Sequence, residues 1–215
     1  MNIAVLGTGI VGQTIGSKLT ELGHNVRIGS RSANNEKAVA WAKQAGDHAS
    51  HGTFGDAAQF GEIIFNCTNG SGALDALRAA ASENLAGKIL IDVSNALDFS
   101  HGFPPTLSVC NTDSLGEQIQ REFPDARVVK TLNTVNSQLM VNPSLVPGTH
   151  DLFMSGNDVN AKAKVREILT EWFGWKVVID VGDITTARGT EQLLPLWVRL
   201  MGEFKSPMFN FHIVR

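Results

Sequence analysis

The stretch Gly7-Thr8-Gly9-Ile10-Val11-Gly12 decides the fold, because it fits the GxGxxG pattern between an apolar run and a helical segment. In this pattern the first glycine permits a tight turn, the second lets the backbone approach a pyrophosphate, and the third allows close packing of helix on strand. The N–H groups at the start of a helix supply donors to the phosphates. The sequence therefore predicts a dinucleotide site formed by Gly7, Thr8, Gly9, Ile10, Val11 and Gly12, with a glycine-rich turn that binds no ligand as the alternative.

Short apolar runs alternate with helix-length segments along the chain, as in a parallel sheet that is covered by helices. Several runs are apolar almost throughout, which is typical of strands buried on both faces. We expect strands at Asn2–Gly7, Asn25–Ser30, Glu62–Thr68, Lys88–Ser94, Arg127–Asn133, Asp151–Ser155 and Lys176–Val181, with a weaker one at His51–Phe54. We expect helices at Ile10–Leu22, Ala33–Ala45, Ser71–Ala86, Ser114–Phe123, Asn160–Phe173 and Thr186–Phe204. This order predicts a Rossmann-like, doubly wound α/β fold with a mostly parallel sheet.

Three segments need separate predictions. Asn95–Asn111 contains two adjacent prolines and is predicted to be an irregular loop after a central strand. In the last helix, Pro195 is expected to introduce a kink, and a buried stripe is expected at Leu193, Leu196, Trp197 and Leu200. The tail Ser206–Arg215 alternates in a way that predicts an edge strand or a strap over another subunit.

Length and composition limit the domain organisation and the class of partner. With 215 residues, 43% hydrophobic and 18% charged, the chain is expected to form a single dinucleotide-binding domain over residues 1–215, with its core at 1–150 and a small α/β extension at 151–215. The net charge of −3 and the lack of a long basic run argue against nucleic acid as a partner. No apolar stretch of about 18 residues and no basic leader occur, so a cytoplasmic protein without a membrane contact is expected.

The end of the second predicted strand indicates which dinucleotide is bound. An NAD site would place an acid about 20 residues after the glycines to hold the ribose hydroxyls. That place reads Ser30-Arg31-Ser32, whose guanidinium and hydroxyls suit a 2′-phosphate. NADP(H) is therefore the predicted cofactor. Lys37, which follows shortly after, either adds a second positive charge or is a solvated surface lysine.

Polar residues at the ends of three later strands are further candidates, because an open α/β sheet binds its ligand at the carboxyl ends of its strands. Backbone and amide groups of Thr68, Asn69 and Gly70, and of Asn95 and Ala96, are expected to line the ribose and nicotinamide. For Asn69 and Asn95 a strand-terminating turn is the equal alternative. Asn133 ends the next strand and is expected to reach the reacting ring.

No side chain is identified as a catalytic group. The chain has no tyrosine, which excludes a tyrosine-based catalytic acid, and the six histidines show no metal-ligand pattern, so no metal site is predicted. Cys67 lies in an apolar segment where burial disfavours a thiolate nucleophile. Arg188 and Glu191, three residues apart, are interpreted as an ion pair on a helix surface.

Taken together, these segments make the chain resemble the NADPH-dependent deazaflavin (coenzyme F-420) reductases, a family that includes the reductase domain of the STEAP metalloreductases. The resemblance spans nearly the whole chain. It is carried by GTGIVG with Leu22-Gly23-His24, IGSR at 28–31, VVKTLNT at 128–134 and GDITTARGTEQLLPLW at 182–197. It implies NADP bound through Thr8–Val11, Ser30 and Arg31, and a hydride that passes to a flavin-like ring stacked on the nicotinamide.

The departures from the family fall where the second ring is expected. Archaeal members of the family that this chain resembles have an apolar, proline-containing loop where this chain has Thr68-Asn69-Gly70. They have another such loop where this chain has Asn95-Ala96-Leu97. They also tend to have His at the position of Asn133. The small-molecule electron acceptor is accordingly left open between a deazaflavin, a flavin, a metal chelate and another small molecule.

Three functions follow from the sequence, in order of preference. The first is hydride transfer between NADP(H) and a flavin-like or deazaflavin acceptor, in which positioning supplies most of the catalysis. The second is a β-hydroxyacid or imine type of reductase, and the third is a non-enzymatic NADP(H) sensor. The acceptor pocket is expected to be built from strand-end loops, the last helix and, in a homodimer, a second subunit.

Overall fold

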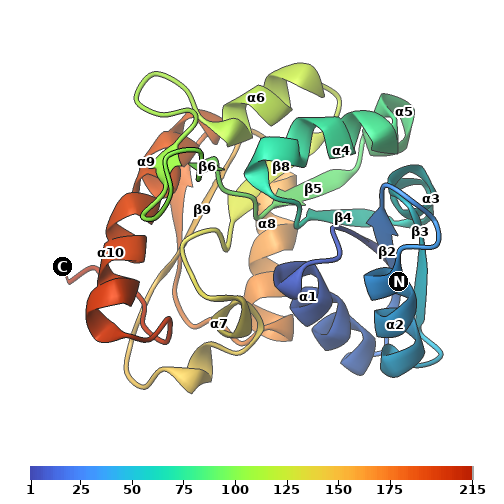
Figure 1. Ribbon diagram of the computed structural model, residues 1–215, viewed down its shortest axis with the longest axis horizontal. Coiled ribbons are helices and arrows are strands. Elements are labelled where there is room, and N and C mark those ends of the chain that lie inside the picture. The colour runs from blue at the N-terminus through green and yellow to red at the C-terminus, as the bar shows by residue number, and fades with distance from the viewer. Residues whose placement is uncertain (215) are drawn as a thin grey trace.

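The computed structural model describes residues 1–214 and shows one eight-stranded sheet between two layers of helices (Figure 1). The strand order is β10-β9-β8-β5-β4-β1-β2-β3. All neighbours are parallel except β8 and β9, which pair antiparallel. The predicted Rossmann-like, mostly parallel fold is confirmed. Strands β9 and β10 continue the same sheet, so residues 151–182 extend the dinucleotide-binding core directly.

The strands lie close to their predicted positions. The sheet contains β1 (Asn2–Leu6), β2 (Asn25–Ser30), β3 (Ala49–Thr53), β4 (Ile63–Asn66), β5 (Ile89–Asp92), β8 (Arg127–Thr131), β9 (Leu152–Gly156) and β10 (Val178–Gly182). The helices are α1 (Ile10–Glu21), α2 (Glu36–Ala45), α3 (Phe54–Phe60), α4 (Ala73–Ala80), α5 (Ser82–Leu85), α6 (Leu115–Glu122), α7 (Ser137–Val141), α8 (Val159–Glu167), α9 (Ala187–Gln192) and α10 (Leu194–Phe204). Within the described residues, none of the helices combines the length and the apolar character that a membrane crossing requires.

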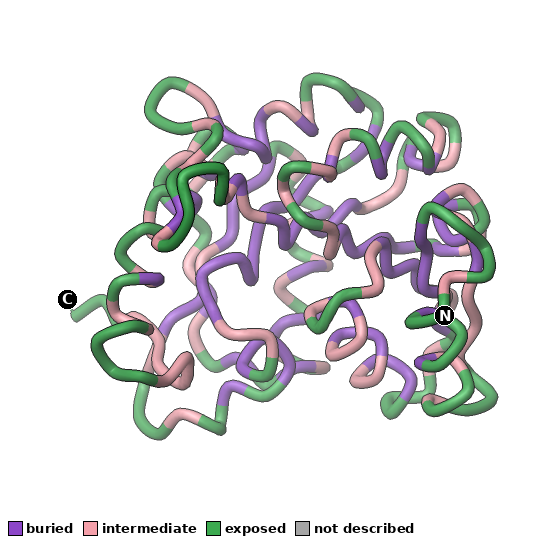
Figure 2. The backbone as a smooth tube through the Cα atoms, viewed as in Figure 1, coloured by how far each residue is buried: buried purple, intermediate pink, exposed green. Residues whose placement is uncertain are grey.

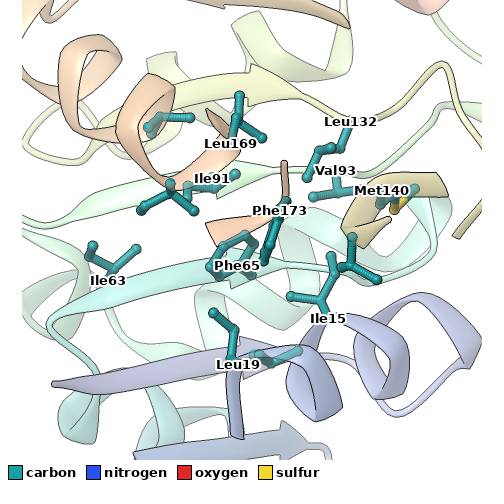
Figure 3. Close-up of a cluster of buried hydrophobic side chains, with 14 of the residues drawn as sticks. Ile15, Leu19, Ile63, Phe65, Ile91, Val93, Leu132, Met140, Leu169 and Phe173 are labelled. Carbon is teal, nitrogen blue, oxygen red and sulfur yellow. The ribbon is translucent and has the colours of Figure 1, made fainter. Parts of the chain in front are cut away.

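Each face of the sheet carries its own apolar core. On one face, side chains of α1, α2, α7 and α8 pack against the strands, and Figure 3 shows Ile15 and Leu19 of α1 facing Phe65 of β4 and Phe173. On the other face, α3, α4, α5, α6 and α9 pack around residues such as Leu90. The buried positions therefore form a band through the centre of the molecule, while the outer turns of the helices are exposed (Figure 2).

Several helices are shorter or more divided than the periodicity predicts. The segment Ser71–Ala86 is interrupted at Ala81, whose φ of 70° ends α4 and begins α5. The segment Asn160–Phe173 changes from α8 to a π-helical turn at Ile168–Trp172. Two short helices, α3 and α7, were not predicted. Thr53 caps α3 through a reciprocal bond with Asp56, a box that uses Asp in place of the usual Glu or Gln.

The last helix and the tail correct two predictions. The helix divides at Leu193, and Pro195 stands in the first turn of α10, where a missing N–H costs nothing. The predicted buried stripe is wrong, because Leu194 and Val198 face the core and Leu196 is 49% exposed. The predicted edge strand is also wrong, because residues 206–214 form no strand. This segment is held instead by a hydrogen bond that the Ile213 N–H donates to the Asp151 carboxylate. Arg215 lies outside the described residues.

The long loop after β5 is partly regular, contrary to the prediction. Two short strands, β6 (Leu97–Asp98) and β7 (Thr106–Leu107), pair antiparallel within Asn95–Asn111. The two prolines stand in the connection between these strands, and the Phe103–Pro104 peptide bond is cis. We call residues 97–107 the β6–β7 hairpin. It projects from the carboxyl end of the sheet beside α9 and α10 (Figure 1).

Candidate functional site

The glycine-rich stretch lies where the strand order reverses. Strand β1 pairs with β2 on one side and β4 on the other, and ligands of open α/β sheets bind at this point. Gly7 has a φ of 118°, and a Cβ added there would lie 2.6 Å from the Cys67 carbonyl oxygen. A Cβ on Gly12 would lie 2.1 Å from the Gly7 carbonyl oxygen. Both glycines are therefore required for the close packing of β1, α1 and β4.

Gly9 and the start of α1 form a cradle suited to an anion. A Cβ on Gly9 would meet no atom within 4 Å, so its surface is open for a ligand to approach the backbone. Gly9 is the N-cap of α1 and makes no side-chain capping bond, and the first turn holds no acid. The N–H donors at this helix start are thus free of side-chain partners and carry the positive end of the helix dipole. These residues fit the pyrophosphate of a dinucleotide.

The turn after β2 presents a guanidinium to solvent. The buried Ser30 hydroxyl donates to the Ser32 carbonyl at 2.6 Å and so shapes the turn. Arg31 is exposed, and one of its nitrogens would lie 3.8 Å from a Cβ placed on Gly72. No carboxylate in residues 1–214 forms an ion pair with Arg31. Lys37, in the first turn of α2, is exposed as well.

A cleft of about 310 Å³ opens between these glycines and the strand ends. Seven predicted residues line it, namely Gly9, Ile10, Val11, Thr68, Asn69, Gly70 and Asn95. Five further residues also line it, namely Cys67, Val93, Ser94, Leu97 and Phe99. Leu97 and Phe99 come from the β6–β7 hairpin. The resemblance to the family already pointed to Leu97, whereas only the unusual length of the loop pointed to Phe99.

The remaining strand-end candidates lie beside or behind this cleft. Asn95 and Asn133 pair through two bonds, Asn133 Nδ2 to Asn95 Oδ1 at 3.1 Å and Asn95 Nδ2 to the Asn133 carbonyl at 2.9 Å. Asn133 is only 4% exposed, so it supports Asn95 from behind. Ala96 is also buried, and its carbonyl accepts from the N–H of Ser108, the residue that follows the hairpin. The Asn69 side chain accepts from the Ser71 N–H. This bond corresponds to the strand-terminating turn, one of the two alternatives predicted for Asn69.

A buried charge cluster beneath the cleft was not foreseen. The Lys130 ammonium lies 2.7 Å from Asp92 Oδ2 and 2.9 Å from Glu191 Oε1, and all three side chains are at most 2% exposed. Burial lowers the pKa of Lys130, but the two carboxylates outweigh this effect and hold the pKa above its ordinary value. The two carboxylates therefore favour the charged form of Lys130. Asp92 also accepts from Asn66 and Ser94, and Thr68 donates to Asn66, which links the cluster to the floor of the cleft.

The interpretation of Arg188 and Glu191 as a surface ion pair is wrong. Glu191 points inward, and its carboxylate accepts from the backbone N–H groups of Leu115 and Gly116 at the start of α6. Arg188 instead binds Glu117 at 2.6 Å, which lowers the pKa of that carboxyl. The division of the last helix at Leu193 and the contacts of α9 with α6 turn the two residues to different partners. Both sets of contacts fasten α9 to α6.

Cys67 lines the cleft, and its chemistry is that of a neutral thiol. Desolvation raises the pKa of the Cys67 thiol well above its usual range, and the charge of Asp92 raises it further. A neutral thiol is a poor nucleophile, which agrees with the exclusion of Cys67 from nucleophilic catalysis.

Comparisons with known proteins identify relatives of this chain. Residues 2–96 match the family described as coenzyme F-420-dependent NADP oxidoreductases. A crystal structure from Arthrobacter sp. fb24, whose provisional name is F-420-dependent NADP-reductase, is 52% identical, and each chain covers 100% of the other with a TM-score of 0.96. An imine reductase from Aspergillus terreus, solved in complex with NADPH4, shares the fold with a TM-score of 0.67. It is 18% identical, and the match covers 95% of this chain and 62% of the imine reductase chain.

A curated relative is the human metalloreductase STEAP2, which is 28% identical over 211 residues. The match covers 97% of this chain but 38% of the relative, so the chain spans little more than a third of that protein's length. Full coverage at 52% identity, together with the family match over the glycine-rich half, settles the assignment. The chain belongs to the family of coenzyme F-420-dependent NADP oxidoreductases and is an NADP-dependent oxidoreductase.

Proposed function

We propose that the protein transfers a hydride between NADP(H) and a flavin-like or deazaflavin acceptor that stacks on the nicotinamide. The observation that carries the proposal is the cleft itself, which joins the uncapped start of α1 to the apolar Leu97 and Phe99 of the β6–β7 hairpin. A planar ring system suits such a hairpin, because aromatic and aliphatic side chains bind flat apolar faces. The name of the Arthrobacter relative supports the same acceptor class.

In this proposal the side chains bind and align, and none exchanges a proton with the substrates. Bound NADP(H) supplies or accepts the hydride. The α1 N-terminus and Gly9 would hold the pyrophosphate, Arg31 and Ser32 would hold the 2′-phosphate, and Asn95, fixed by Asn133, would contact the nicotinamide. Holding two rings in contact converts a bimolecular transfer into a nearly unimolecular one.

The proposal is tested by anaerobic mixing of the protein with NADPH and one acceptor at a time, followed by absorbance. Oxidised deazaflavin F-420, FMN and a ferric chelate are the acceptors, and a cyclic imine tests the second reductase class. Rapid NADPH oxidation with a deazaflavin or flavin is expected. Turnover with the imine alone, or with none of these acceptors, would contradict the proposal.

Replacement of Arg31 by alanine is expected to weaken NADPH binding by about 1.5–3 kcal/mol, because charge-assisted bonds to the 2′-phosphate are lost. NADH binding is expected to change little. Titration calorimetry of both cofactors measures the difference. Lys43→Ala, an exposed lysine at the other end of α2, is the matched control and is expected to leave both affinities unchanged. An equal loss for both cofactors in Arg31→Ala would refute the 2′-phosphate assignment.

Replacement of Phe99 by alanine is expected to raise the acceptor KM about 2- to 12-fold with the NADPH KM unchanged, since about 0.5–1.5 kcal/mol of ring contact is lost. Phe99 is 53% exposed and lines the cleft from the hairpin, so its removal leaves the core intact. Val159→Ala, on the exposed start of α8, serves as the control. A rise in the NADPH KM instead would place Phe99 at the cofactor.

A further inference from the structure

A line of polar side chains crosses the sheet beneath the cleft. Asn66 of β4 is the register partner of Asp92 of β5, and Asp92 is the register partner of Lys130 of β8. Their side chains are bonded in the same order, with Asn66 Nδ2 to Asp92 Oδ1 at 2.8 Å and Lys130 Nζ to Asp92 Oδ2 at 2.7 Å. Glu191 of α9 completes the line at 2.9 Å from Lys130. Four elements far apart in sequence therefore meet in one buried network.

This network carries an excess of negative charge. Two carboxylates share one ammonium, and all three side chains are at most 2% exposed. An ionised carboxylate only accepts hydrogen bonds, and every bonded partner of Asp92 and Glu191 within residues 1–214 is a donor. The N–H groups at the start of α6 offset about half a unit of the charge of Glu191. An uncompensated charge in a protein interior is costly, and charges kept in this way are frequent at functional sites.

The network is hydrogen-bonded to the lining of the cleft. Ser94 donates both its N–H and its hydroxyl to Asp92 Oδ1, and its carbonyl accepts from Lys130 at 2.6 Å. Thr68 donates its hydroxyl to Asn66, which is bonded to the same carboxylate. In the part of the chain that the structure describes, none of the residues that line the cleft is itself charged. The field inside the cleft therefore depends on the buried network beneath it.

The strand order indicates which part of the cofactor lies over this network. Along the sheet the strands run β2, β1, β4, β5 and β8 (Figure 1). The proposed pyrophosphate site is at the end of β1, and Arg31 follows β2 on one side of it. A dinucleotide spans the crevice, so its nicotinamide half is expected on the other side, over the ends of β4 and β5. Asn66 and Asp92 are the last residues of these two strands.

The nicotinamide ring is the part of the cofactor whose charge changes in the reaction. Hydride transfer breaks the C4–H bond of NADPH, moves one proton with two electrons to the acceptor, and leaves one positive charge on the ring. A fixed negative charge beneath the ring favours its cationic form over its neutral form. This preference is strongest where water is excluded, because the charges are then screened least.

We propose that the buried Asp92–Lys130–Glu191 network strengthens the binding of NADP⁺ relative to NADPH and so favours hydride transfer out of NADPH. Tighter binding of the oxidised form makes the bound cofactor a stronger reductant, because the two equilibria are linked. The three residues act through their charge and touch no reacting atom. The proposal rests on the nicotinamide placement in the proposed function, but not on the identity of the acceptor.

Glu191→Gln tests the proposal, because it removes one charge and nearly preserves the shape of the side chain. Its oxygen can still accept from Lys130 and Gly116. The dissociation constant of NADP⁺ divided by that of NADPH is expected to rise about 3- to 10-fold. Asp92→Asn is expected to raise this ratio as well. Titration calorimetry of each cofactor form measures the ratio without an acceptor, so a failure here is distinguishable from a failure of the proposed hydride transfer.

Two further variants separate charge from structure. Glu191→Asp keeps the charge but shortens the side chain, so stability is expected to fall while the ratio stays within about 2-fold of that of the natural chain. Glu117→Gln removes another buried carboxylate from the contact of α6 with α9. Glu117 is paired with the partly exposed Arg188 and, among residues 1–214, makes no bond to the cleft lining. Its ratio is expected to stay within about 2-fold as well.

Two results would overturn the proposal. One is a Glu191→Gln protein with an unchanged ratio, whether both affinities fall equally or neither falls, since a merely structural network gives that result. The other is a Glu117→Gln protein whose ratio shifts as far as that of Glu191→Gln. Thermal denaturation shows which variants fold. If Glu191→Gln did not fold, an unchanged ratio in Asp92→Asn would overturn the proposal in the same way.

Discussion

Lys130→Met is expected to lower the free energy of unfolding by about 3–5 kcal/mol, because it leaves two carboxylates buried without their shared cation. Asp92 and Glu191 both lie within 2.9 Å of the ammonium and are at most 2% exposed, so neither can regain water without local unfolding. Urea denaturation followed by circular dichroism measures the loss.

Two companion variants make this measurement specific. Lys164→Met removes a cation from an exposed i,i+3 pair with Glu167 and is expected to change stability by less than about 1 kcal/mol. Glu191→Gln leaves Lys130 paired with Asp92 and is expected to cost less than Lys130→Met. If Lys130→Met were no more destabilising than Lys164→Met, the buried cluster would not contribute to stability as argued.

Gly12→Ala is expected to lower kcat/KM for NADPH about 100-fold and stability by about 1–3 kcal/mol. The new Cβ would lie 2.1 Å from the Gly7 carbonyl oxygen, a backbone atom, so α1 must move by about 1 Å relative to the end of β1. That movement misaligns the helix N–H groups with the pyrophosphate. Steady-state kinetics and thermal denaturation measure the two effects.

Gly9→Ala is the matched comparison within the same stretch. Its Cβ would meet no protein atom within 4 Å, so stability is expected to stay unchanged, while NADPH affinity falls because the methyl group occupies the path of the ligand. Unchanged NADPH affinity in Gly9→Ala would contradict the approach of the pyrophosphate to this backbone.

Much of the cofactor half could be predicted from local sequence. Gly12 is required by its contact with Gly7, five residues away, and Gly7 by its positive φ as well as its contact with Cys67. The apolar runs of β1 and β4 reveal strands buried on both faces. Short elements were missed, because the five residues of α7 give too few turns for a periodic pattern.

The contacts of α9 beneath the cleft could not be predicted, because they join residues far apart in sequence. Helical spacing alone makes Arg188 and Glu191 neighbours on a surface. Because α9 packs against α6, Arg188 instead pairs with Glu117, and Glu191 pairs with Lys130. The same limit applies to α10, whose apolar residues were expected inside because periodicity does not say which of two apolar sides meets the core.

The sequence by itself determined the Rossmann-like sheet, the glycine cradle and the guanidinium after β2, since the pattern that indicates each of them lies in short stretches of the chain. Only the tertiary structure decided that Asp92, Lys130 and Glu191 meet beneath the cleft and that Phe99 lines it. The physical reason is that steric and periodic constraints act along the chain. The partner of a buried charge, and the occupant of a cleft wall, depend instead on which strands and helices become neighbours in space.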